Sequence, residues 1–128
     1  SVAGERDLGG WRVLVTGGRN YDDRQCVFDN LDVVHAVCPI TLLIEGGARG
    51  ADRLCREWAI ARGIPYETMN AEWDRHGRAA GLIRNGQMLD RCPRILVAFP
   101  GGRGTDNCCN QAAERRIPVY FSRQLRPT

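Results

Sequence analysis

Five short apolar runs, dense in branched side chains, alternate with segments of helical spacing, and this alternation limits the fold more than any other feature. The apolar runs are residues 11–16, 41–45, 65–69, 94–99 and 117–121. Four of them are almost continuously apolar, which is typical of strands buried on both faces of a parallel sheet. The weakest run, 65–69, is expected at an edge of the sheet. The helices between the strands are expected at residues 23–37, 50–62, 78–91 and 105–115.

The regular order of strand and helix predicts the fold class. We expect an α/β protein with a single Rossmann-like, three-layer domain, in which right-handed crossovers connect a five-stranded parallel sheet of strand order 3-2-1-4-5. The domain should span residues 11–122. Residues 1–10 are expected to be a flexible N-terminal tail, and residues 123–128 a C-terminal tail.

The composition argues against several classes of protein. The 128 residues contain no apolar stretch long enough to cross a membrane, and the N-terminus lacks the apolar core of a signal peptide. We therefore expect a cytoplasmic protein with no membrane partner. A net charge of +3 is too small to indicate nucleic-acid binding by itself.

The six cysteines include no CxxC pair, so the sequence predicts no metal site. Without a secretory context they are expected to be reduced thiols, several of them in the core. The neighbours Cys108 and Cys109 are an open alternative as a redox-active pair, although the sequence shows no partner for them.

Three glycine-rich turns each follow an expected strand and lead into an expected helix. Their glycines are Gly17 and Gly18 in the first turn, Gly46, Gly47 and Gly50 in the second, and Gly101, Gly102 and Gly104 in the third. Because parallel strands end on the same edge of a sheet, the three turns should converge there. Tight turns of this type favour glycine for conformational reasons alone, which is the structural alternative. No turn matches GxGxxG or GxxxxGK[ST], so neither a standard dinucleotide fingerprint nor a P-loop is predicted.

The chemistry of these turns suits a phosphate. Glycine lets backbone N–H groups approach a ligand closely, and a helix N-terminus adds unpaired N–H groups and partial positive charge. Each turn also carries one arginine, Arg19, Arg49 or Arg103, which can pair with phosphate through two hydrogen bonds. Asp52 and Asp106 are placed either to orient a ligand or simply to begin a helix.

A polar segment at residues 71–90 should leave from the same edge. Trp73 is placed to stack on a purine, and Arg84 with Asn85 could face the pocket. The alternatives are that Trp73 only packs over the following helix and that the arginines of this segment are solvated.

Four motifs together resemble the SLOG superfamily, nearest to its YspA-like, cpYpsA-related branch. They are VTGGRNYDD (15–23), EGGARGADRL (45–54), GRAAGLIRNGQML (77–89) and AFPGGRGTDN (98–107). The resemblance covers residues 11–121. It implies a Rossmann-like fold that binds a nucleotide or a nucleotide-derived small molecule, with no further cofactor.

The superfamily also includes the LOG phosphoribohydrolases, whose signature PGGxGTxxE ends in a catalytic glutamate. Residues 100–105 match it at Pro100, Gly101, Gly102, Gly104 and Thr105, but the glutamate falls on Cys108. A thiol does not replace a carboxylate in glycoside chemistry. Arg84 lies in the segment that resembles the one supplying their catalytic arginine, whereas Asn85 departs from their pattern. Glu45 is expected to be structural or to bind ribose.

The leading hypothesis is therefore a module that binds a phosphorylated, nucleotide-derived ligand. Its expected ligand-binding residues are Gly17, Gly18, Arg19, Glu45, Gly46, Gly47, Arg49, Gly50, Asp52, Trp73, Arg84, Asn85, Pro100, Gly101, Gly102, Arg103, Gly104 and Thr105. The second hypothesis is a nucleotide N-glycosidase of the LOG type. The third is single-stranded DNA binding of the DprA type, which the few aromatic residues near the arginines disfavour. LOG-type relatives form dimers, so a homodimer is expected, with the helices at 50–62 and 78–91 as candidate faces.

Overall fold

The computed structural model describes residues 9–127 and shows a five-stranded, all-parallel sheet of order β3-β2-β1-β4-β5. Its strands are β1 (Trp11–Thr16), β2 (Ile40–Glu45), β3 (Tyr66–Thr68), β4 (Ile95–Ala98) and β5 (Val119–Phe121). This confirms the predicted fold class and strand order. Most of the expected N-terminal tail, residues 1–8, lies outside the described residues, as does residue 128.

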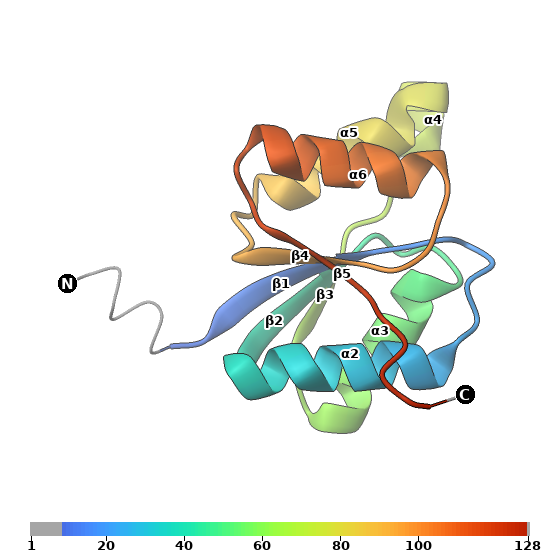
Figure 1. Ribbon diagram of the computed structural model, residues 1–128. Helices are drawn as coiled ribbons and strands as arrows, with labels where there is room; N and C mark the ends of the chain where they lie inside the picture. The colour runs from blue at the N-terminus through green and yellow to red at the C-terminus, as the bar shows by residue number, and fades with distance from the viewer. Residues whose placement is uncertain (1–8, 128) are drawn as a thin grey trace.

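Helices cover both faces of the sheet (Figure 1). They are α2 (Arg24–Val37), α3 (Ala51–Arg62), α4 (Trp73–His76), the 3₁₀ helix η1 (Gly77–Ala79), α5 (Ala80–Leu89) and α6 (Arg103–Glu114). The pair α2 and α3 packs on one face and the pair α5 and α6 on the other. The two helices expected as candidate dimer faces, α3 and α5, therefore lie on opposite sides of the sheet.

The central strands bury side chains on both of their faces, as their continuous apolar sequence predicts. In β1, Val13 and Val15 pack under α2 and α3, whereas Leu14 packs under α5 and α6. In β2, Leu43 packs under α2 and α3, and Ile44 packs under α5 and α6. The two halves of the core are thus fixed by a period of two residues along each strand.

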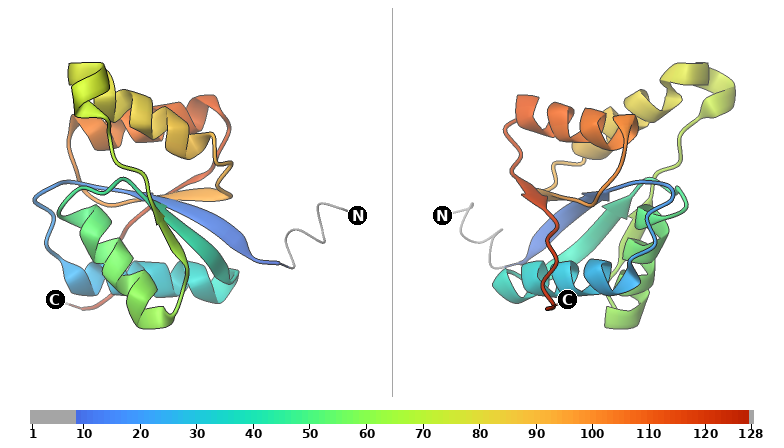
Figure 2. Two further views of the ribbon diagram at one scale, coloured as in Figure 1. Left: turned by 180° about the vertical axis from the view of Figure 1, so that it is seen from behind. Right: turned by 45° about the vertical axis from the view of Figure 1, so that its right-hand side comes forward.

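Two differences from the sequence-based expectation concern the C-terminal edge of the sheet. The helix expected at 78–91 is preceded by the short helix α4, which Gly77 ends with a φ of +57°. This helix stands out from the end of the molecule (Figure 2). The last helix, α6, begins at Arg103 rather than at residue 105. Arg103 and Gly104 consequently belong to the first turn of α6 and not to the loop before it.

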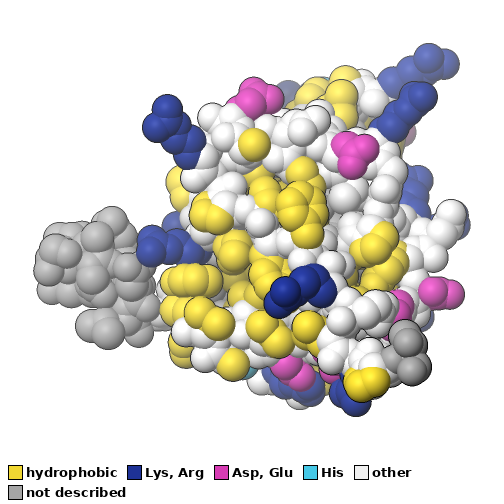
Figure 3. All heavy atoms as spheres, in the orientation of Figure 1, with side chains coloured by type: hydrophobic (Ala, Val, Ile, Leu, Met, Phe, Trp, Pro, Cys, Tyr) yellow, Lys and Arg dark blue, Asp and Glu magenta, His cyan; other side chains and the backbone are white. Residues whose placement is uncertain are grey.

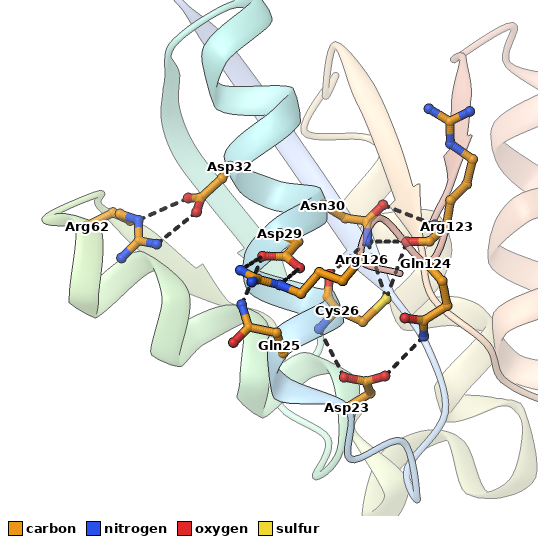
Figure 4. A network of polar contacts seen from close by, with 10 residues as sticks. All are labelled: Asp23, Gln25, Cys26, Asp29, Asn30, Asp32, Arg62, Arg123, Gln124 and Arg126. Atoms are coloured by element: carbon orange, nitrogen blue, oxygen red, sulfur yellow. Dashed lines mark hydrogen bonds and ion pairs between the residues drawn. The ribbon is translucent and has the colours of Figure 1, made fainter. Parts of the chain in front are cut away.

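The segment after β5, set apart by the sequence as a tail, lies along α2 (Figure 4). Asn30 is fully buried, and its amide donates to the carbonyl of Arg123 at 2.9 Å. The Asn30 amide oxygen accepts from the N–H of Arg123 at 3.0 Å and from the Tyr120 hydroxyl at 2.8 Å. Arg126 makes two hydrogen bonds to Asp29. Arg123 and Arg126 of the expected C-terminal tail are therefore hydrogen-bonded to α2.

Candidate functional site

The three glycine-rich turns meet at the C-terminal edge of the sheet, as predicted. The turn after β1 is hydrogen-bonded to both of the others: the N–H of Gly18 donates to the carbonyl of Pro100 at 2.8 Å, and the N–H of Ala51 donates to the carbonyl of Gly18 at 3.1 Å. These bonds leave little room between the backbones of neighbouring turns.

Four of the eight glycines, Gly17, Gly18, Gly50 and Gly101, serve this close packing of one turn on another. A Cβ built on Gly17 would lie 2.4 Å from the Cβ of Ala51, and one built on Gly101 would lie 2.1 Å from the Thr105 hydroxyl. Gly50 has a φ of +76°, and its Cβ would lie 2.4 Å from the Gly18 carbonyl oxygen. Only at Gly102 and Gly104, among the eight glycines of these turns, would a Cβ meet nothing within 4 Å. These two positions leave the backbone open to a ligand.

A cleft of about 370 Å³ opens between the turns, α4, α5 and the start of α6. Eleven of the residues predicted to bind ligand line it: Gly17, Gly18, Arg19, Asp52, Trp73, Arg84, Asn85, Gly102, Arg103, Gly104 and Thr105. Seven predicted residues are not in its lining: Glu45, Gly46, Gly47, Arg49, Gly50, Pro100 and Gly101. The second turn thus contributes its helix start, Asp52, and Ala48, but none of its glycines.

Sequence reasoning missed one wall of the cleft. Arg78, Gly81, Leu82 and Met88 also line it, alongside Arg84 and Asn85. The signal was present as spacing, because residues 78, 81, 85 and 88 recur at intervals of three and four and so share one side of a helix. The sequence indicates a polar segment at residues 71–90 but assigns only Trp73, Arg84 and Asn85 of it to the pocket, which leaves out the other residues on this side of the helix.

The N-terminus of α6 opens into the cleft without a side-chain cap. Gly102 occupies the N-cap position and offers no side-chain oxygen, and no side-chain cap for this helix is found within residues 9–127. Such an end carries partial positive charge and favours an anion. Thr105, in the first turn, is buried and adds a hydroxyl to the same wall.

Arg84 and Asn85 tie the second turn to the start of α6. Arg84 donates to the carbonyl of Gly46 and, through Nε, to the amide oxygen of Asn85 at 3.3 Å. Asn85 is buried, and its amide donates to the carbonyl of Gly104 at 3.1 Å. These contacts hold the guanidinium of Arg84 at the wall of the cleft with its position fixed from two sides.

Positive charge gathers around the cleft. Its lining residues include Arg19, Arg78, Arg84 and Arg103 against one carboxylate, Asp52. Arg19 lies with its Cζ 5.8 Å from the centre of the Trp73 ring, which is half exposed. Basic side chains are also seen at the end of the molecule that carries α4 (Figure 3). The field in the cleft therefore favours an anionic ligand.

Glu45 has a structural environment and lies outside the cleft. It is fully buried; Gly47 N–H donates to its Oε1 at 2.6 Å, and the Thr68 hydroxyl donates to its Oε2. Arg56 lies 3.8 Å from the same carboxylate. Of the two roles expected for Glu45, these contacts favour the structural one, since its oxygens already have partners.

Asp52 is 6% exposed and holds the second turn through one oxygen, Oδ2, which accepts from the N–H groups of Gly46 and Ala48 at 3.2 Å each. It is therefore not an N-cap, a position that Gly50 occupies. Burial raises the pKa of Asp52 to about 6, and the charge of Glu45 adds to this effect, while the two N–H groups and Arg84 oppose it.

Cys108, at the position of the LOG glutamate, lies beneath the cleft and is not one of its lining residues. Its side chain is fully buried beside Thr16, and burial raises the pKa of its thiol to about 12. The group is a neutral thiol at physiological pH, with neither the charge nor the access of a general acid or base. All six cysteines are free, three of them buried.

We predict a clear order of alkylation among these thiols. Iodoacetamide at pH 8 should modify the exposed Cys92 first, whereas Cys108 and Cys55 should stay unmodified in the native protein because both are buried and both have a raised pKa. Peptide mass spectrometry over a time course measures the order. Labelling of Cys108 as fast as that of Cys92 would contradict the closed environment described here.

The described residues offer neither a membrane span nor a preformed metal centre. Among residues 9–127, no helix is both long and apolar enough to cross a bilayer. The same part of the chain contains no cluster of three or more His, Cys, Asp or Glu side chains suited to a metal ion.

Comparison with known proteins identifies the class to which this fold and cleft belong. The sequence pattern of the YspA, cpYpsA-related SLOG family matches residues 11–76, from β1 through α4. The chain therefore belongs to this family. It is also similar to the Gene 61 protein of Mycobacterium phage D29, with 38% identity over 116 residues that cover 84% of this chain and 93% of the phage protein.

Proposed function

We propose that this protein binds a phosphorylated, nucleotide-derived ligand, with a phosphate group at the N-terminus of α6. The observation that carries the proposal is the uncapped start of α6, which opens into a cleft lined by four arginines. The open backbone at Gly102 and Gly104 lets phosphate oxygens approach the N–H groups directly. The cleft volume of about 370 Å³ lies within the range of small-molecule sites.

Trp73 supports a nucleoside as the rest of the ligand. Trp73 is 49% exposed at the cleft; its ring lies near Gly81, which has no side chain to cover it, and the guanidinium of Arg19 lies 5.8 Å from the ring centre. Stacking of a base on such a ring contributes about 1–3 kcal/mol and tolerates any base, because every base has a flat face. Membership of the SLOG family is consistent with a nucleotide-related ligand.

Hydrolysis of the LOG type is the weaker alternative. The position of its glutamate holds the buried, neutral thiol of Cys108, which can neither stabilise an oxocarbenium-like centre nor activate water. Binding without turnover is therefore the function that the cleft supports best.

Single-stranded nucleic acid has less support than a small ligand. Continuous binding of a strand needs several stacking platforms along a basic groove. Among the described residues that line the cleft, Trp73 is the one aromatic side chain.

Calorimetric titration with the four nucleoside 5′-monophosphates and with inorganic phosphate tests the proposal. We expect saturable binding of at least one nucleotide, more tightly than phosphate, and no free base after prolonged incubation. Release of free base would show that the protein is a hydrolase and would contradict binding without turnover. Absence of binding to every nucleotide and to phosphate at millimolar concentration would overturn both.

A second prediction concerns Arg84. Arg84→Met keeps the stem of the side chain but removes a charge held at the cleft wall, so nucleotide affinity should fall about 10- to 30-fold, the value of roughly one charge-assisted hydrogen bond. Arg53→Met removes the same charge from the exposed side of α3, outside the cleft, and is the matched control. Equal weakening by both variants would show that only net charge matters.

We also propose a homodimer through one of the two helices named by the sequence. Ile60 on α3 is 61% exposed, and Leu82 and Ile83 on α5 are 47% and 36% exposed. Because the helices lie on opposite faces of the sheet, Ile60→Glu and Ile83→Glu should differ in their effect. Light scattering of the two variants identifies the face, and a wild-type protein that stays monomeric at high concentration would refute the dimer.

A further inference from the structure

Asp52 presents an unsatisfied acceptor to the cleft. Its Oδ2 is occupied by the N–H groups of Gly46 and Ala48. Its Oδ1 has no hydrogen-bond partner among residues 9–127, and it does not belong to the fully enclosed polar atoms of that part of the chain. Because Asp52 is 94% buried and lines the cleft, the surface that remains to Oδ1 faces the cavity.

The surroundings make this acceptor costly in the free protein. Glu45 on β2 repels its charge, Arg84 on α5 attracts it, and Cys55 on α3 and Cys108 on α6 are neutral, poorly polar neighbours. A buried carboxylate oxygen without a donor is unfavourable unless a ligand or water supplies one. We therefore expect the ligand in the cleft to carry a hydrogen-bond donor that faces Asp52 Oδ1.

The ligand group that can supply this donor follows from the rest of the lining. A phosphate at the start of α6 offers acceptors and negative charge, which Asp52 would repel. A base stacked on Trp73 lies at the exposed mouth, since Trp73 is half exposed whereas Asp52 is buried at the base of the cleft. A sugar joins phosphate to base in a nucleotide, and its hydroxyls are donors of the required kind.

The acid that a dinucleotide-binding fold commonly uses for this purpose stands at the end of the second strand. Here that residue is Glu45, whose oxygens are taken by Gly47 and Thr68 and which lies outside the cleft. Asp52, seven residues further along, is the carboxylate in the cleft lining.

We propose that Asp52 Oδ1 accepts a hydrogen bond from a ribose hydroxyl of the ligand and makes the site selective for ribonucleotides. This inference rests on the proposed function, because it assigns a part of the same ligand. A carboxylate that accepts from a hydroxyl discriminates strongly against an analogue that lacks it, since the buried acceptor is then left unpaired.

Calorimetric competition between ribonucleoside and 2′,3′-dideoxyribonucleoside 5′-monophosphates of the same base measures this selectivity. The wild-type protein should prefer the ribonucleotide at least tenfold. Asp52→Asn keeps an oxygen for the two N–H groups of the turn but removes the charged acceptor, so the preference should fall to threefold or less. The affinity for inorganic phosphate should not fall, because the change removes a negative charge from the cleft, and this separates loss of hydroxyl recognition from damage to the phosphate site.

Asp106→Asn is the matched control, because it makes the same change in the first turn of α6 outside the cleft lining, and it should keep the full preference. Equal affinity of the wild type for ribo- and dideoxynucleotides would overturn this inference and leave the phosphate site standing. A wild type that binds neither nucleotides nor phosphate would overturn the proposed function and this inference together. If affinity depends on the base and not on the sugar, Asp52 accepts its hydrogen bond from the base, and this result would also refute the proposal.

Discussion

Replacing Gly50 with alanine should lower the free energy of unfolding by about 4 kcal/mol, the combined cost of a backbone conformation that residues other than glycine rarely adopt and of an overpacked contact. Gly50 has a φ of +76°, and the added Cβ would lie 2.4 Å from the Gly18 carbonyl oxygen and 2.5 Å from the Arg19 carbonyl oxygen. Both neighbours are backbone atoms, so no side chain can rotate away. Urea denaturation followed by circular dichroism measures the loss.

Gly63 provides a control without the clash. Its φ of +69° is similar and its Cβ would meet nothing within 4 Å, but its ψ of 29° is that of the left-handed helical region, whereas the ψ of Gly50 is −126°. Gly63→Ala should therefore cost only about 1 kcal/mol, the cost of a left-handed residue in open space. If Gly50→Ala is no worse than Gly63→Ala, the turns do not pack as closely as the structure has them.

The second large effect is a pH-dependent cost of burying Asp52. Its pKa is raised to about 6 in the folded protein, against about 3.9 in an unfolded chain. Below the unfolded-state pKa of about 3.9, Asp52 is protonated in both the folded and the unfolded protein and does not lower the free energy of unfolding. As the pH rises from there through 6, the free energy of unfolding falls, because the unfolded chain releases this proton more readily than the folded protein. The difference of about two pKa units corresponds to roughly 3 kcal/mol.

Comparison of the wild type with Asp52→Asn isolates this contribution, since the other titrating groups cancel. The stability of the variant relative to wild type should rise by about 2–3 kcal/mol between pH 4 and pH 8. Asp29→Asn provides the control: Arg126 lowers the pKa of Asp29, so the contribution of this carboxylate changes only below about pH 4, and the stability of this variant relative to wild type should stay nearly constant between pH 4 and pH 8. A relative stability of Asp52→Asn that is constant across this range would contradict the buried, charged state of Asp52.

The two predictions on Asp52 also belong together. The Asp52 carboxylate lowers the free energy of unfolding of the free protein at neutral pH, and it gains a hydrogen-bond partner when the ligand binds. Binding sites often contain groups that destabilise the free protein in this way. Asp52→Asn should accordingly give a protein that is more stable at pH 8 and less selective for its ligand.

The fold could be read from the sequence because its signals are local and repeated. Continuous apolar runs such as that of β1 need cover on both faces, and parallel strands need helical crossovers, so few arrangements remain. The glycines also indicated correctly that the turns converge. The sequence could not indicate the role of each glycine. A glycine needed for contact between turns, such as Gly17, cannot be distinguished by sequence from one with open space beside it, such as Gly102.

The residues that line the cleft were less predictable than the fold, because the lining depends on the positions that side chains take in the folded protein. The helix α6 begins two residues before the start expected from the sequence, so Arg103 and Gly104 belong to its first turn. Asp52 and Glu45 are both carboxylates beside the second turn, and only their contacts separate the one in the cleft lining from the one that braces the turn. Such distinctions arise from packing between segments far apart in the chain.

The most direct test of the phosphate site is a titration of the ¹⁵N-labelled protein with inorganic phosphate, followed by amide chemical shifts. The backbone N–H groups of residues 102–105 should show the largest, saturable shifts, with smaller ones around Arg84 and Asp52. Shifts that are absent up to high millimolar phosphate, or that cluster away from the start of α6, would contradict the account.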